Sequence, residues 1–131
     1  MPFTTQIDHE RREIRTTVRG PVTLEDLRRH LEEGRRAGAL AYPEIYDARG
    51  AQVRFTPADV RSTVGILREL RKESELGPGA IVVASDFAYG MLRMLEILAG
   101  DICPVRPFRS AEDAERWIES LRHAQNNPST T

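Results

Sequence analysis

The stretch AIVVASDFAYGMLRMLEILAG, residues 80–100, contains the pattern that decides the fold. It begins with a continuous apolar run through Val83, which is typical of a strand covered on both faces. Ser85 or Asp86 then caps a helix whose apolar side chains recur at helical spacing. A buried strand followed at once by a helix is the repeating unit of a parallel α/β sheet.

Alternating side chains near the amino terminus predict a hairpin. Residues 3–7 and 13–19 place an apolar or threonine side chain at every second position, as half-buried strands do. Gly20-Pro21 is expected to end the second strand. The elements outside these strands and residues 80–100 are, in chain order, a helix capped by Thr23, a strand at about 44–48, a helix opened by Thr56-Pro57, an edge strand in 103–108 and a helix capped by Ser110.

The order of elements, β-β-α-β-α-β-α-β-α, predicts an α/β fold with a mostly parallel sheet. The opening hairpin adds an antiparallel strand, so the sheet is expected to be mixed. A chain of 131 residues fits one domain, which we expect over residues 1–123. Residues 124–131 are polar, and we expect them to be a disordered tail.

Composition excludes several classes of function. With 19 basic and 20 acidic residues, the net charge of −1 argues against a nucleic-acid-binding protein. The sequence has no apolar run near the ~18 residues of a membrane span, and its start does not resemble a signal peptide. A single cysteine cannot form an internal disulfide, so we expect a soluble cytoplasmic protein.

Few residues are candidates for catalysis. Cys103 has no histidine near it in the sequence and is interpreted as a buried, inert thiol. His9, His30 and His123 are interpreted as solvated surface residues, because no two of them have metal-ligand spacing. The chain also lacks a phosphate-binding loop between a strand and a helix. We therefore expect no catalytic residue, no cofactor and no metal, and a protein that is not an enzyme.

A ligand site, if there is one, is expected at the carboxyl ends of the strands, where open α/β sheets bind their ligands. This rule selects five candidate binding residues: Asp47, Arg49, Asp86, Tyr89 and Arg93. Asp47 and Arg93 are close enough in this arrangement to form an ion pair. The pair would either fix the helix on the sheet or mark a site whose arginine recognises an anionic group.

The helix after Val83 has two apolar stripes rather than one. We expect the first stripe to be core, and it consists of Phe87, Met91, Met94 and Leu98. The second stripe is a candidate interface, and it consists of Ala88, Leu92, Leu95 and Ala99. Three roles are open for the second stripe: core beneath the last helix, contact with another subunit, or one wall of an apolar pocket.

Five segments together carry a family resemblance: GPVTLEDLRRHLEEG, YPEIYDARG, FTPADVRST, AIVVASDFAYGMLRMLEIL and PVRPFRSAEDAERWI. Over about residues 5–121 the chain resembles the small bacterial SpoIIAA-like proteins of the STAS superfamily. The resemblance implies a four- or five-stranded mixed sheet with helices largely on one face. It also implies a non-enzymatic regulatory domain that binds a protein partner, either another protein or a second copy in a homodimer.

Two further expectations follow from the resemblance. Relatives of this subgroup are compared with the CRAL-TRIO lipid-binding fold, so the alternative function is a carrier or sensor of a lipid-like or anionic ligand. Phospho-switched antagonists carry an Asp-Ser-Ser-Gly-like motif where this chain reads RFTPADV, residues 54–60. Thr56 takes the place of the phosphorylated serine and is the candidate phosphorylation site, although its position before Pro57 already explains it as a helix cap.

Overall fold

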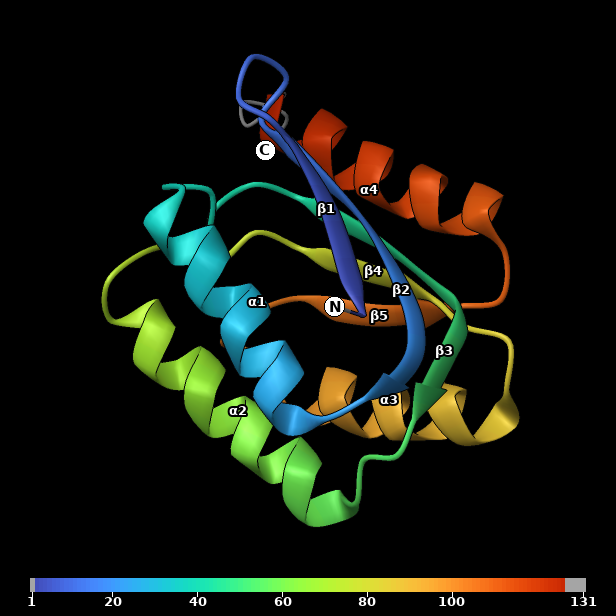
Figure 1. The fold of residues 1–131 in the computed structure, drawn as a ribbon. Helices are drawn as coiled ribbons and strands as arrows, with labels where there is room; N and C mark the ends of the chain where they lie inside the picture. Colours follow the sequence, from blue (N-terminus) through green and yellow to red (C-terminus); the bar gives the residue numbers. More distant parts are fainter. Residues whose placement is uncertain (1, 127–131) are drawn as a thin grey trace.

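The computed structural model describes residues 2–126, and its five strands form one sheet in chain order (Figure 1). The first two strands pair antiparallel, and each later strand pairs parallel with the one before it. This mixed sheet confirms the predicted fold class. The strands are β1 (Phe3–Asp8), β2 (Glu13–Val22), β3 (Glu44–Val53), β4 (Gly79–Val82) and β5 (Val105–Phe108).

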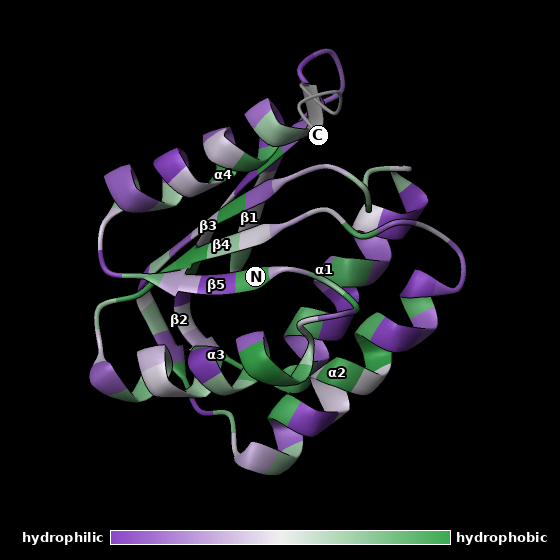
Figure 2. Cartoon of the chain, turned by 180° about the vertical axis from the view of Figure 1, so that it is seen from behind, coloured by the Kyte–Doolittle hydropathy of each residue, from purple (hydrophilic) through white to green (hydrophobic). Residues whose placement is uncertain are grey.

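The helices cover the sheet unequally. Three of them lie on one face and α4 lies on the other, as the two opposite views show (Figures 1 and 2). This arrangement agrees with the expectation of helices largely on one face. The four helices are α1 (Leu24–Arg36), α2 (Pro57–Arg71), α3 (Asp86–Leu98) and α4 (Ala111–Asn126). Helix α4 thus includes residues 124–126 of the expected tail, whereas residues 127–131 lie outside the described residues.

Local sequence determines where the helices begin. The hydroxyls of Thr23 and Thr56 accept hydrogen bonds from the backbone N–H groups of Asp26 and Asp59, each at 3.1 Å. Each aspartate accepts in return from the N–H of its threonine, which completes a capping box. At α3 the cap is Ser85. These caps are the ones that the sequence predicts.

Strands β2 and β3 are longer than expected. Strand β2 does not end at Gly20-Pro21 but continues to Val22, paired with the second half of β3. A register shift lies between Thr17 and Arg19, and Gly20 adopts a φ of 72°, which a residue without Cβ tolerates. The bulge and the glycine allow β2 to continue through Gly20-Pro21. The paired strands β2 and β3 therefore extend beyond the end of β4.

The first apolar stripe of α3 is more exposed than expected, although its Met91 and Met94 pack against the core, and the second stripe takes the core role, one of the three roles open to it. Leu95 is only 8% exposed and Ala99 is 0% exposed, and both belong to a buried cluster. In contrast, Phe87 and Leu98 of the expected core stripe are 54% and 43% exposed. Ile97, which belongs to neither stripe, is 71% exposed.

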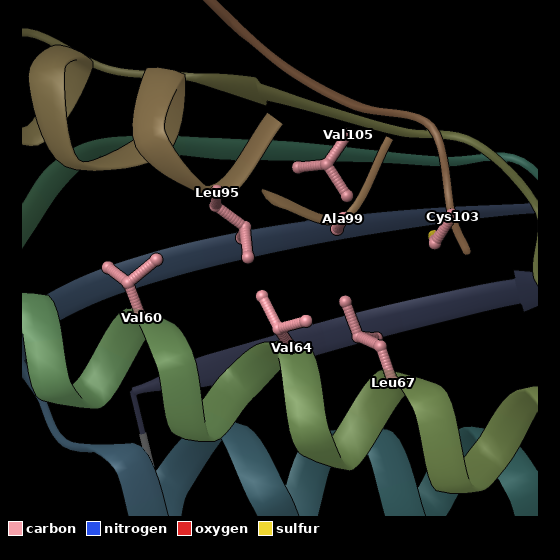
Figure 3. Packing of buried hydrophobic residues seen from close by; sticks show 7 residues of the cluster. All are labelled: Val60, Val64, Leu67, Leu95, Ala99, Cys103 and Val105. Atoms are coloured by element: carbon pink, nitrogen blue, oxygen red, sulfur yellow. The ribbon is translucent and has the colours of Figure 1, made fainter. Parts of the chain in front are cut away.

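Helix α2 is the element that covers the second stripe. Its Val60, Val64 and Leu67 point toward Leu95 and Ala99 of α3 (Figure 3). The last helix, which one of the three alternatives placed there, packs instead on the opposite face of the sheet, against Ala80 and Val82 among others. The candidate interface is therefore corrected: Ala88, Leu95 and Ala99 are buried in the core of this chain, and Leu92 is partly buried beside them.

Candidate functional site

A cavity of about 350 Å³ lies between the sheet and helices α1 and α2, with one side of α3 closing it. A volume of this size is in the range of small-molecule pockets. Most of the side chains around it are aliphatic or aromatic, and they include Val18, Leu27, Leu67 and Leu92.

A small polar cluster breaks the apolar lining of this cavity. Nε2 of His30 lies 2.7 Å from Oε2 of Glu44, and the Thr16 hydroxyl donates to the same oxygen at 2.6 Å. The three side chains come from α1, β3 and β2. His30 is 6% exposed, and Thr16 is also buried. Burying polar groups is costly unless they are paired, and here they are paired with one another.

Aromatic rings hold the imidazole of His30 in place. The ring of Phe3 stacks on it with 4.7 Å between centroids, and the ring of Tyr46 meets it edge-on at 5.6 Å. Burial and the neighbouring Glu44 carboxylate raise the pKa of Tyr46 well above its usual value. The Tyr46 phenol is therefore a neutral hydrogen-bond donor at physiological pH.

The interpretation of His30 as a solvated residue is wrong. The signal that could have found it is its position beside Leu27 and Leu31 on the apolar face of α1. Thr16 gives a second signal, because it lies between Ile14 and Val18 on the inward face of β2. Polar residues within an apolar stripe are the informative exceptions.

The interpretation of Cys103 as a buried thiol is confirmed. The residue is a free cysteine, and its Sγ lies 3.4 Å from the carbonyl oxygen of Gly77. Burial, with a smaller contribution from Glu44, raises its pKa to about 11. A thiol with this pKa is almost wholly protonated near neutrality, which makes it a poor nucleophile.

The predicted residues at the strand ends lie apart from this cavity, and their charges are paired at the surface. Asp47 pairs with Arg49, with 2.9 Å between Oδ2 and Nη2, and this contact lowers the pKa of Asp47. Arg93 pairs with Glu96 at 2.8 Å. The ion pair expected between Asp47 and Arg93 is thus replaced by two pairs with sequence neighbours.

Asp86 and Tyr89 share one partner that sequence reasoning missed. Arg109, just after β5, donates to Oδ1 of Asp86 at 2.6 Å, and its guanidinium lies 4.6 Å from the centroid of the Tyr89 ring. This ion pair lies at the surface, because the Asp86 side chain is 96% exposed. The binding role of the five strand-end residues stays a prediction.

The described part of the chain contains neither a metal-binding cluster nor a helix that could span a membrane. Within residues 2–126, histidine, cysteine and carboxylate side chains do not gather in groups of three or more that could hold a metal ion. None of the helices in that range combines the length and the apolar character that crossing a bilayer requires.

Comparison with known proteins places this geometry in a known fold. No protein-family model matches the chain, and no curated protein matches it significantly. It is similar to the crystal structure of an uncharacterised DUF3478-family protein with a SpoIIAA-like fold from Shewanella loihica PV-4. That match has 13% identity and a TM-score of 0.57, and it covers 88% of this chain and 91% of the other.

A second solved structure gives the same result. The chain is similar to the unphosphorylated form of the anti-sigma factor antagonist SpoIIAA, with 15% identity and a TM-score of 0.55. This match covers 92% of this chain and 97% of the other. At such low identity the similarity concerns the arrangement of the elements. The chain has the SpoIIAA-like α/β fold.

Proposed function

We propose that this chain is a non-enzymatic regulatory domain of the STAS type, which acts in the cytoplasm by binding another protein. The SpoIIAA-like fold supports the regulatory class, because one structure that shares it is an anti-sigma factor antagonist. The observation that carries the proposal is the outward face of α3. We call Phe87, Ile97 and Leu98 the outer face of α3, since these are the exposed large apolar side chains.

The outer face of α3 has the composition of a protein-binding surface. Interfaces typically join an apolar centre to a charged rim, and exposed apolar patches with polar borders mark interaction sites. Ion pairs between Arg93 and Glu96 and between Arg109 and Asp86 border this face. Because these charges are already paired, a partner can approach the apolar centre without desolvating single charges.

The proposal is tested by photo-crosslinking in the source cells. A photoreactive phenylalanine analogue replaces Phe87 in one variant and Arg116, an exposed residue of α4, in a matched control. We expect one protein to be crosslinked at position 87 and not at position 116. Crosslinking only to a second copy would assign the outer face to a homodimer, and equal crosslinking at both positions would refute the proposal.

A binding measurement with the purified partner completes the test. Ile97→Asp places a charge at the carboxyl-terminal end of the outer face, on its most exposed apolar side chain, and we expect it to weaken binding at least about tenfold. Arg116→Ala is the control and should bind as the wild type does. Unchanged affinity of Ile97→Asp would contradict the role of this face.

Thr56 is the proposed point of regulation. It is exposed at the amino end of α2, where a helix favours a negative charge. Its hydroxyl also holds the capping box with Asp59, so phosphorylation would break that contact. Incubation with an anti-sigma-type serine/threonine kinase, followed by mass spectrometry, tests the idea, and an unmodified Thr56 would end it.

A further inference from the structure

We propose that the interior cavity binds an uncharged, mostly apolar molecule through a hydrogen-bond-donating head such as a hydroxyl group. The site goes beyond the proposed partner-binding function, since it lies inside the chain and not on the outer face of α3. It also differs in position from the strand-end residues that the sequence selects.

The volume sets the size of the ligand. A cavity of about 150 Å³ lined by aliphatic and aromatic side chains binds benzene, which has six carbon atoms. The cavity of this chain is about 350 Å³, so by proportion it accommodates about 14 non-hydrogen atoms. A medium-chain or small-ring molecule meets this limit, whereas a whole phospholipid or a nucleotide exceeds it.

The polar cluster determines the head group. Both hydrogen bonds that His30 and Thr16 make to Glu44 end on Oε2. A carboxylate has about four acceptor positions on its two oxygens, and Tyr46 is a further hydrogen-bond partner of Glu44, so Glu44 keeps capacity for one more donor. Glu44 and His30 both line the cavity, and the ring contacts to Phe3 and Tyr46 fix the imidazole before any ligand arrives. A ligand hydroxyl can donate to Glu44 there.

The charges of the lining argue against an anionic head. Among the described residues that surround the cavity, the acidic side chains are Glu33 and Glu44, the one basic side chain is His30, which is already paired with Glu44, and neither arginine nor lysine is present. Glu44 is the carboxylate of the buried cluster, and Glu33 of α1 is exposed. A fatty-acid carboxylate placed beside Glu44 would therefore meet like charge in a poorly solvated space.

One end of the cavity lies close to the surface. His30 and Phe3 also line a small cleft together with Pro2, Asp26 and Arg29. The side chains of His30 and Phe3 thus lie between the cavity and this surface cleft. A ligand that enters here would meet Glu44 with its polar head.

Calorimetric titration of the full-length chain with three matched probes tests the proposal. The probes are 1-nonanol, its isomer 1-methoxyoctane, which accepts hydrogen bonds without donating any, and nonanoate. We expect 1-nonanol to bind about tenfold more tightly than either of the others, because only its hydroxyl can donate a hydrogen bond to the Glu44 carboxylate without adding a negative charge. Absence of saturable 1-nonanol binding, or equal affinity for 1-nonanol and 1-methoxyoctane, would overturn the proposal.

Variants locate the binding in the cavity. Glu44→Gln keeps the shape and removes the charge, so the preference for 1-nonanol over nonanoate should fall at least about threefold. Val18→Phe fills part of the space from β2 and should abolish binding while the circular dichroism spectrum stays native. Arg116→Ala on α4, away from the cavity and from the outer face of α3, is the control and should leave binding unchanged. An unchanged preference in Glu44→Gln would refute the assigned site even if Val18→Phe fails to fold.

Discussion

The assignment of the two faces of α3 predicts opposite consequences for two neighbouring truncations. Leu95→Ala removes three carbon atoms from the buried cluster that α3 forms with α2. Ile97→Ala removes three carbon atoms from the outer face two residues further on. Both changes are made in the same helix and to the same residue, so their helix propensities differ little.

The expected magnitudes differ about fourfold. Buried Leu→Ala substitutions lose about 2.7–5 kcal/mol of stability. Leu95 also borders the cavity and has fewer neighbours to lose, so the lower end, about 3 kcal/mol, applies. Ile97 is 71% exposed, and at about 0.8 kcal/mol per buried CH₂ its truncation loses about 0.7 kcal/mol. At about 2.1 cal/mol/K per residue over 131 residues, these losses lower Tm by about 11 °C and about 3 °C.

Urea denaturation followed by circular dichroism measures both variants against the wild type. Equal m-values would show that the comparison concerns stability and not a changed unfolded state. A loss in Ile97→Ala as large as that in Leu95→Ala would mean that the helix is rotated from its position here. If Leu95→Ala has wild-type stability, Leu95 is not buried in the core, and the second stripe is again a candidate interface.

Three further outcomes are expected from the contacts described. Thr56→Ala should lose about 1 kcal/mol through the broken cap to Asp59, and Thr56→Asp should recover most of it in the same urea assay. Arg15 lies 2.6 Å from Glu115 and lowers its pKa from 4.5, so this contact stabilises the fold at neutral pH and is lost on acidification. Glu115→Gln should therefore differ from the wild type by less than about 1 kcal/mol at pH 7, and by less still at pH 3. Cys103, with a pKa of about 11 instead of 9.0, should react with a thiol reagent at pH 8 about a hundredfold more slowly than an unperturbed cysteine, and fast labelling would contradict its burial.

The parts of the fold that follow from local chemistry could be predicted. Threonine and serine caps mark the starts of the helices, and period-two alternation marks β1 and β2, because both depend on residues a few positions apart. The extension of β2 past Gly20-Pro21 could not be predicted in this way. It depends on pairing with β3, whose length is decided by tertiary contact.

The sequence could not decide which stripe of α3 faces the core, for a physical reason. A helical wheel gives the angle between two apolar stripes but not which neighbour each one meets. The right-handed crossover from β4 to β5 places α3 on the face that α2 occupies, so the stripe with Leu95 and Ala99 turns inward. Phe87, Ile97 and Leu98 are exposed because no other element of the described chain covers that side.

Helix α3 joins the two proposals, because its opposite sides serve different surfaces. Leu92 and Leu95 border the cavity, whereas Phe87 and Ile97 lie on the outer face. A ligand that alters the position of α3 would alter partner affinity, and thermodynamic linkage requires the partner to change ligand affinity by the same factor. That factor is measured by titrating 1-nonanol into the chain alone and into its complex with the partner that crosslinking identifies. If the affinity for 1-nonanol is the same with and without the partner, the cavity and the outer face work independently. If the two affinities differ in the wild type but not in Glu44→Gln, the coupling depends on the polar cluster.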